Sequence, residues 1–241
     1  MSGSAPTGPD LHAQYRALLQ RLEANEGEFR RLGRSVWRVQ EDERKRLARE
    51  LHDGIGQNLT ALKHQLALLG SALGPGNAPL RERVDAAIGL CASTLDDTRQ
   101  LSRLLRPPIL DDLGLVPALR WLARNIEQGG GPEVMLEADA LDGIDPDLQT
   151  LLFRFVQEAL NNAAKHAHAR QARVLLQARG GSIRLRVEDD GAGFDPARVQ
   201  PGSGSGLGGM QERLRLYGGH FHLESAPGEG TRIDAIVPID D

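Results

Sequence analysis

"RELHDGIGQ", from Arg49 to Gln57, interrupts a long helical pattern with a histidine, an aspartate and two glycines. Glycine costs the interior of a helix about 1 kcal/mol relative to alanine, so Gly54 and Gly56 form a local weakness that packing alone would not select. His52 comes one residue after an apolar position, about 100° around the helix from it. Its neighbours one turn away, Ala48 and Gly56, are small. The sequence therefore predicts an outward-facing imidazole with clear space around it.

Upstream of this stretch, apolar residues recur at alternating steps of four and three. They occupy positions 11, 15, 18, 22, 29, 32, 36 and 39, and Asn25 fills the one missing position. This pattern favours a parallel coiled coil, in which one buried asparagine fixes register and strand number. A single amphipathic helix packed on its own domain is the alternative. We interpret 11–40 as a coiled-coil helix that pairs two copies of the chain, preceded by a disordered tail at 1–10.

Downstream of the same stretch, two apolar helical patterns are separated by "GPGNAP" at 74–79. The second pattern ends before "RPP" at 106–108. Two antiparallel helices cannot bury both of their apolar faces alone, whereas pairing in a dimer makes a four-helix bundle. We therefore predict an α-helical antiparallel hairpin over 41–110 that forms a dimeric four-helix bundle. A linker at 111–131, containing one short helix and a Gly-rich run, follows it.

The second half of the chain alternates strand and helix patterns. A strand is expected at 132–139, a helix opened by Asp145 as N-cap and Pro146 as first residue, and two strands within 172–191. Another helix at 206–218 and a hairpin at 220–239 close the chain. This order predicts a second domain over 132–241, an α+β sandwich with one mixed sheet and helices on one face.

Polar residues of the expected long helix stack on one face. Glu158, Asn162 and Lys165 are spaced four and three apart. A carboxylate, an amide oxygen and an ammonium in a row suit a hydrated Mg²⁺ ion and the phosphates it carries, because Mg²⁺ prefers oxygen ligands and keeps several waters. Taken alone, an ordinary polar helix face is the simpler interpretation.

Two glycine-rich segments strengthen the case for a nucleotide. "DDGAGF" at 189–194 ends a strand with Asp190, Gly191 and Gly193, so a carboxylate lies beside a backbone that a flat ligand can approach closely. "GSGLGGM" at 204–210 opens a helix with glycines whose N–H groups can hold phosphate. A dinucleotide-binding βαβ unit is disfavoured, because no strand pattern precedes this second segment.

Composition excludes several other classes. A formal net charge of −4 argues against nucleic acid as a direct partner, and Cys91, the single cysteine, excludes an internal disulfide framework and suits a reducing cytoplasm. No apolar run approaches the roughly 20 residues that cross a bilayer, and the first residues lack a secretory pattern. We therefore expect a cytoplasmic chain without a membrane segment, to which a natural upstream sensor region could be joined.

These motifs resemble a known family in both halves of the chain. "QEALNNAAKHA", "DDGAGF", "GSGLGGMQER" and "SAPGEGT" look like the N, G1 and G2 boxes and closing hairpin of the Bergerat-type ATP-binding domain. Bacterial sensor histidine kinases share this domain with gyrase, the Hsp90 chaperones and MutL. "ERKRLARELHDGIGQNL" resembles the phosphoacceptor box of histidine kinases typified by the nitrate and membrane-fluidity sensors. The likeness covers roughly residues 40–240.

The resemblance implies a role for each candidate residue. His52 would be the phosphoacceptor, Asp53 the acid that orients or deprotonates it, and Gln57 the residue that positions water in a phosphatase reaction. The nucleotide-site residues implied are Asn162 and Glu158 for Mg²⁺, Lys165 for the phosphates, Asp190 for the adenine amino group, Gly191 and Gly193 for the pocket lining, Gly204, Gly206, Leu207 and Gly208 beside the triphosphate under a lid at about 194–203, and Thr231 beside the adenine.

The function implied is that of a homodimeric sensor histidine kinase that uses ATP and Mg²⁺. Its partner would be the receiver domain of a response regulator with a helix-turn-helix output domain, towards which the chain could also act as a phosphatase. Two alternatives stay open: an ATPase or serine kinase with the same nucleotide fold, and a dimeric scaffold that binds nucleotide without transferring phosphate.

Overall fold

The computed structural model describes residues 8–74, 76–141, 143–198 and 206–239. Most of the predicted tail, part of the predicted lid and Gly204 lie outside the described residues, as do the side chains of the first seam positions. The chain forms two compact units, one of residues 39–118 and one that joins residues up to Arg38 to residues 119–241. The helix that begins at Gly8 includes the last three positions of the predicted tail.

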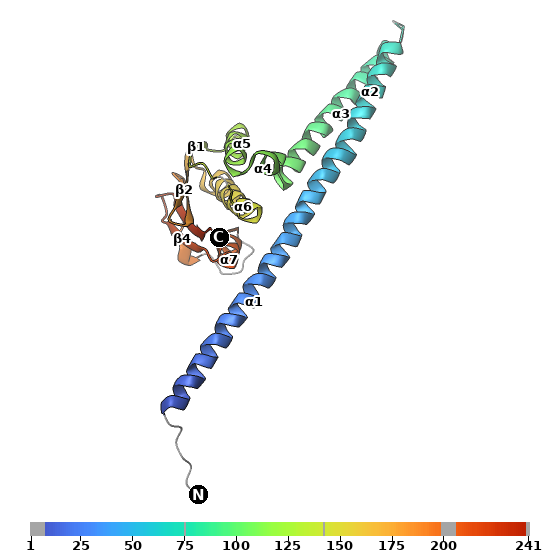
Figure 1. The fold of residues 1–241 in the computed structure, drawn as a ribbon. Coiled ribbons are helices and arrows are strands. Elements are labelled where there is room, and N and C mark those ends of the chain that lie inside the picture. The colour runs from blue at the N-terminus through green and yellow to red at the C-terminus, as the bar shows by residue number, and fades with distance from the viewer. Residues whose placement is uncertain (1–7, 75, 142, 199–205, 240–241) are drawn as a thin grey trace. The chain divides into compact units, whose positions relative to one another are not determined.

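The first unit is the predicted helical hairpin. Helix α1 (Gly8–Arg49) runs into a π-helical segment, η1 (Glu50–Gly56), and then into α2 (Gln57–Ala72), and α3 (Ala78–Leu105) returns beside α2 (Figure 1). The hydroxyl of Ser102 donates a hydrogen bond of 2.8 Å to the carbonyl of Ala48, and Leu95 is buried between the helices. The interruption predicted at 74–79 is confirmed.

A single hairpin leaves much of its apolar surface in solvent. Large apolar side chains on both helices are about half exposed or more, among them Leu62, Leu69, Leu90 and Leu101. On α1, the seam residues Phe29, Leu32, Val36 and Val39 are also exposed. Apolar stripes of this kind on α-helices are the surfaces that bundles and coiled coils bury.

An ion-pair cluster fixes the start of the connection after α3. Arg106 donates a hydrogen bond of 2.7 Å to Asp111 in α4 (Pro108–Leu113), and the ammonium of Lys45 lies 3.0 Å from the same carboxylate. Burial raises the pKa of Asp111, but the hydrogen bonds from Arg106 and Lys45 outweigh it and hold the pKa below its ordinary value. The cluster joins α4 to the end of α1.

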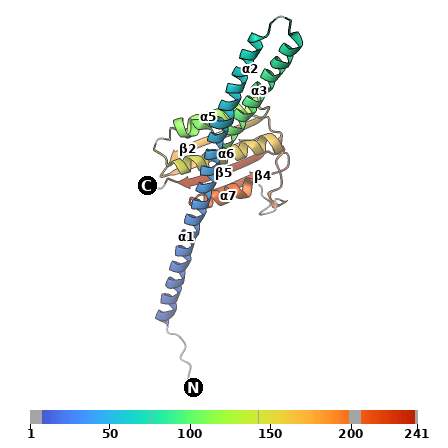
Figure 2. The ribbon, with the colours of Figure 1, turned by 90° about the vertical axis from the view of Figure 1, so that its right-hand side faces the viewer.

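The second unit contains the predicted mixed sheet. Its strand order is β1 (Glu133–Ala138), β2 (Gln171–Arg179), β3 (Ser182–Asp189), β5 (Thr231–Pro238) and β4 (His220–Ser225). Strands β1 and β2 are parallel, and the other neighbours are antiparallel. Helices α5 (Leu115–Gln128), α6 (Pro146–Asn162) and α7 (Gly206–Leu216) cover the same face of the sheet (Figure 2).

The core lies between these helices and the sheet. In α6, Leu152, Phe153 and Leu160 are fully buried. The carboxylate of Asp145 accepts hydrogen bonds from the first turn of α6, which confirms the predicted N-cap. The predicted linker at 111–131 differs from the structure: Leu119 and Leu122 of α5 are 1% and 2% exposed, so most of this segment is a helix of the core.

Candidate functional site

The first candidate site is the turn of π-helix that carries His52. The segment η1 includes both glycines, and His52, Asp53 and Gly54 are exposed, so the predicted outward orientation is confirmed. A π-helix, whose hydrogen bonds span five residues rather than four, is rare and is frequently found at functional sites. Gly56 is buried, and a Cβ atom there would lie 3.9 Å from a methyl of Leu95, so α3 passes close to this turn.

A pocket of about 370 Å³ opens beside His52 between the two helices of the hairpin. Gln57 and His64 of α2 and Arg99 of α3 line it together with the imidazole. The π-helical spacing brings position 57, five residues on, towards the same side as position 52. Asp53 is exposed but is not among the described residues that line this pocket. The roles of His52, Asp53 and Gln57 stay predictions.

The second candidate site begins at the end of α6. Glu158 and Asn162 are half-buried, and Lys165 is exposed in a second π-helical segment, η2 (Ala163–Ala167). A Cβ atom at Gly206, the first residue of α7, would occupy the space of the Glu158 carboxylate. The start of α7 therefore lies directly against the side chain of the predicted magnesium ligand.

The glycines of "DDGAGF" hold the end of β3 against two other segments. A Cβ atom at Gly191 would lie 2.5 Å from the carbonyl oxygen of Ala167, and the N–H of Ala192 donates to the same oxygen at 2.8 Å. Gly193 has φ +58°, a conformation that favours glycine. Any larger residue at this position would clash with the carbonyl of Ala226 in the β4–β5 hairpin. The end of η2, the end of β3 and the hairpin therefore meet at one place.

The two neighbouring carboxylates of this motif, Asp189 and Asp190, lie in different environments. Along β3, Ile183, Leu185 and Val187 face the core, so the period of two places Asp189 on the helix-covered side and Asp190 on the other. Burial raises the pKa of Asp189, against hydrogen bonds that it accepts from the N–H groups of Gly191 and Thr231.

Asp190 has a structural task on the solvent side. Its exposed carboxylate accepts hydrogen bonds of 2.9 Å and 2.7 Å from the N–H groups of Gln171 and Arg170, at the start of β2. These two hydrogen bonds lower the pKa of Asp190, and the bond from Gln171 has the larger effect. The adenine role expected of Asp190 does not fit this geometry. The sequence analysis did not single out Asp189. The alternation of apolar and polar residues along β3 could have identified it, because it places Asp189 on the same side as Val187.

The closing hairpin fixes the other wall of the site. The hydroxyl of Ser225 accepts a hydrogen bond from the N–H of Phe194 at 2.9 Å and donates to the carbonyl of Gly230 at 2.8 Å. Thr231 pairs with Asp189 across β3 and β5, with its hydroxyl 3.2 Å from that of Ser225. The structure thus brings together the predicted site residues of α6, β3, the hairpin and α7. Leu207 is half-buried and Gly208 exposed in the first turn of α7.

The donor set fits a magnesium ion that arrives with a nucleotide. Among the described residues, no group of three or more His, Cys, Asp or Glu side chains is placed to hold a metal ion. One carboxylate and one amide, from Glu158 and Asn162, suit an ion that keeps several waters and binds mainly to substrate phosphates.

Comparison with known proteins agrees with both halves of this description. Residues 43–110 match the family described as histidine kinase, and residues 147–241 match the family of histidine kinase-, DNA gyrase B- and HSP90-like ATPases. The sensor histidine kinase MctS of Rhizobium johnstonii is 37% identical over 83% of this chain and 44% of its own length. The oxygen sensor histidine kinase NreB of Staphylococcus carnosus is 38% identical over 84% of this chain and 58% of its own.

A solved histidine kinase domain from Erythrobacter litoralis, of a blue-light activated kinase, has a TM-score of 0.49 at 22% identity and covers 76% of this chain and 94% of that one. The chain spans about half the length of the curated relatives it matches. Within the described part of the chain, no helix has both the length and the apolar character needed to cross a membrane.

A phosphoacceptor-type helical hairpin followed by this ATPase fold defines the core of a histidine kinase. The chain belongs to the sensor histidine kinases.

Proposed function

We propose that this chain is an ATP-dependent histidine autokinase. A ring nitrogen of His52 attacks the γ-phosphorus of ATP, the bond from that phosphorus to the bridging oxygen breaks, and ADP leaves. The phosphoryl group then passes to an aspartate of a response regulator receiver domain. The observation that best supports this proposal is that His52 is exposed in a π-helical turn beside a pocket. The other half of the same chain has the ATPase fold.

In the nucleotide site, we propose that Asp189 accepts the hydrogen bond from the adenine amino group. Its side chain lies on the helix-covered side of the sheet, between the Gly191 backbone and Thr231. Asn162 and Glu158 would hold the hydrated Mg²⁺, and Lys165 would reach the phosphates. Mg²⁺ would neutralise the charge that develops on the transferred group. The glycines at 206 and 208 would offer backbone N–H groups at the positive end of α7.

Asp53 and Gln57, the two polar residues near His52, have different proposed roles. Asp53 is exposed next to His52 and would orient the imidazole or accept its proton during attack. Gln57 shares the pocket with the imidazole and would position a water molecule when the chain dephosphorylates its receiver domain. The two activities then depend on different side chains of one helical turn.

We also propose that the active form is a homodimer. The exposed apolar stripes of α1, α2 and α3 would pair to give the coiled coil and the four-helix bundle. The receiver domain would approach His52 on the open side of the bundle, and its regulator would carry a helix-turn-helix output domain. The buried, unpaired thiol of Cys91 suits a cytoplasmic location.

One experiment tests the proposal. The full chain is incubated with γ-labelled ATP and Mg²⁺, and we expect protein-bound label that is labile in acid, stable in base and absent from His52→Gln. His64→Gln is the matched control, since His64 lines the same pocket one helix further along. Label that survives in His52→Gln would exclude His52 as the acceptor. ATP hydrolysis without any label would favour an ATPase, and nucleotide binding with neither reaction would favour a scaffold.

A further inference from the structure

The buried face of α3 changes character where it passes the π-helical turn η1. Its buried residues follow a heptad-like spacing, with Val84, Cys91 and Leu95 in the first part and Thr98 and Ser102 in the last. The first three are apolar, whereas the last two carry hydroxyl groups. Burying a hydroxyl group costs free energy unless it finds a hydrogen-bond partner. The two hydroxyl groups are therefore better explained by the bonds they make than by packing.

The two hydroxyl groups have different partners. Thr98 donates a hydrogen bond of 2.7 Å to the carbonyl of Thr94 in its own helix, as threonines within α-helices often do. Ser102 instead donates across the hairpin, at 2.8 Å, to the carbonyl of Ala48. Both ends of this second bond are shielded from water, since Ser102 is 4% exposed and Ala48 is 6% exposed. The bond therefore ties α3 to the last turn of α1.

The carbonyl of Ala48 lies at the point where the helix changes type. In a regular α-helix it would accept the backbone N–H of His52, four residues further on. In a π-helix, each carbonyl accepts the fifth N–H instead. A side chain that bonds to a helix carbonyl competes with the α-helical pattern and is a known cause of local bends. Ser102 therefore acts two residues before η1 begins at Glu50.

The far end of η1 has a similar bond. The hydroxyl of Thr60 donates a hydrogen bond of 2.8 Å to the carbonyl of Gly56, the last residue of η1. A π-helical turn differs from an α-helical one in which N–H each carbonyl accepts, so its place along a helix depends on what else the flanking carbonyls accept. Two hydroxyl groups thus mark the two ends of the turn that carries His52, and one of them comes from the other helix of the hairpin.

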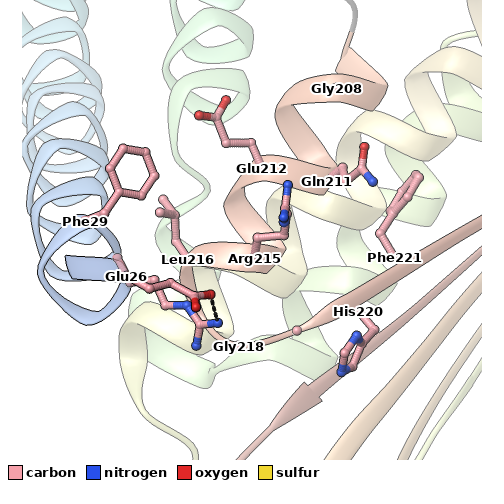
Figure 3. Close-up of a pocket in the computed structure, with 12 residues that line it drawn as sticks. Glu26, Phe29, Gly208, Gln211, Glu212, Arg215, Leu216, Gly218, His220 and Phe221 are labelled. Carbon is pink, nitrogen blue, oxygen red and sulfur yellow. Dashed lines mark hydrogen bonds and ion pairs between the residues drawn. The ribbon is translucent and has the colours of Figure 1, made fainter. Parts of the chain in front are cut away.

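The hydroxyl-bearing part of α3 also borders the pocket beside His52. Thr98 is one of the residues that line this pocket of about 370 Å³. A larger pocket, of about 970 Å³, opens between α1 and α7 in the ATP-binding unit, with Phe29 and Phe221 on its walls (Figure 3). Among the described residues that line this larger pocket, only Gly208 has a proposed role in the reaction. The smaller pocket is therefore the one in which helix packing bears on the phosphoacceptor.

We propose that Ser102 is a positioning residue for autophosphorylation. Its hydroxyl holds the π-helical turn at Glu50–Gly56 in place, and so fixes the direction in which the imidazole of His52 faces the γ-phosphate. Without this bond the turn can slide or relax, and a shift of one residue in the hydrogen-bond pattern turns the side chains that follow by about 100° around the helix. The effect on the rate rests on the proposed kinase activity, but the environment of the imidazole can be measured without that activity.

The first test removes the hydroxyl in two matched pairs of full-length chains. Ser102→Ala is compared with the parent, and Ser102→Val is compared with Ser102→Thr, which has the same shape but keeps a hydroxyl. We expect Ser102→Ala and Ser102→Val to autophosphorylate about tenfold more slowly at saturating ATP than their hydroxyl-bearing partners, because one buried hydrogen bond is worth about that factor. The KM for ATP should stay unchanged, because Ser102 lies outside the ATP-binding unit.

The matched control is Ser93→Ala. Ser93 is exposed on the same helix, and its hydroxyl donates a hydrogen bond of 3.0 Å to the carbonyl of Leu90 in that helix. We expect this variant to be labelled at the parent rate. Circular dichroism shows which variants are folded, and if one pair does not fold, the other pair decides. Equal rates within the folded pairs, or an equal loss in Ser93→Ala, would overturn the proposal.

The second test observes His52 directly by NMR. Proton–carbon signals of the imidazole rings are recorded from histidine-labelled chains, and the signal of His52 is identified by its absence from His52→Gln. We expect this signal to move in Ser102→Ala relative to the parent and in Ser102→Val relative to Ser102→Thr, but not in Ser93→Ala. A His52 signal that stays in place would refute the positioning role, with or without label. If the signal moves but no chain takes up label, the parent included, the proposed kinase activity fails and the positioning of His52 stands.

Discussion

The adjacent carboxylates at 189 and 190 allow a sharp test, because the structure gives them opposite roles. We expect Asp189→Asn to weaken binding of an ATP analogue by about 10- to 150-fold, which corresponds to losing a charged hydrogen bond of about 1.5–3 kcal/mol. Asp190→Asn should bind the analogue as the parent chain does, because its carboxylate contacts the backbone of Arg170 and Gln171.

The same pair predicts opposite changes in stability. Burial raises the pKa of Asp189, so its ionised form destabilises the fold above that raised pKa, and the cost disappears as the pH falls towards the ordinary value of 3.8. Asp189→Asn should raise the melting temperature at pH 7.5, because the amide removes the partly buried negative charge. The pKa of Asp190 is lowered, so its ionised form stabilises the fold above 3.8 and that stability is lost at lower pH.

Calorimetric titration with the analogue and thermal unfolding of the full chain at pH 7.5 and pH 4.5 measure both effects. The expected pattern is weaker binding with higher stability for Asp189→Asn, and normal binding with lower stability for Asp190→Asn. The stability gain of Asp189→Asn should shrink at the lower pH. Loss of analogue binding in Asp190→Asn but not in Asp189→Asn would show that Asp190, and not Asp189, faces the nucleotide.

Three further outcomes are expected. Gly191→Ala should destabilise the ATP-binding unit by about 1–3 kcal/mol in thermal unfolding, because its Cβ would lie 2.5 Å from the carbonyl oxygen of Ala167. Asp111→Asn should lower the stability of the helical unit by about 1–2 kcal/mol at pH 7, and this difference should vanish as the pH falls below 3.8, which circular dichroism would follow. Gly54→Ala should raise helical stability by about 0.5–1 kcal/mol, because its Cβ would meet open space, while lowering the autophosphorylation rate.

Much of the fold could be predicted because its signals are local. The period of the apolar residues gives the helices and strands, and Asp145 with Pro146 marks the start of α6 within a few residues of sequence. The outward position of His52 follows from its spacing alone. Helix α5 was the exception: the glycines at 129–131 suggested a linker, and only the packing of Leu119 and Leu122 shows that it belongs to the core.

The site was predictable only where one segment decides the geometry. The stacking of Glu158 and Asn162 is a property of one helix, and the side of the sheet taken by Asp189 is a property of one strand. The contact of Trp37 with Tyr217 is different, since it joins residues that are far apart in the sequence and have no shared pattern. Tertiary packing alone defines it, so this contact could not be expected before the structure.

The two π-helical segments connect these observations. Both candidate reactive stretches contain one: η1 carries His52, and η2 follows Asn162 and carries Lys165. A π-helix is rare, and the short π-helical turns found inside α-helices are frequently at functional sites. At Gly54 the chain also keeps a glycine where the space around it would accept alanine. A sequence selected for stability alone would remove both features, so their presence argues that the turn around His52 is shaped for access by other domains.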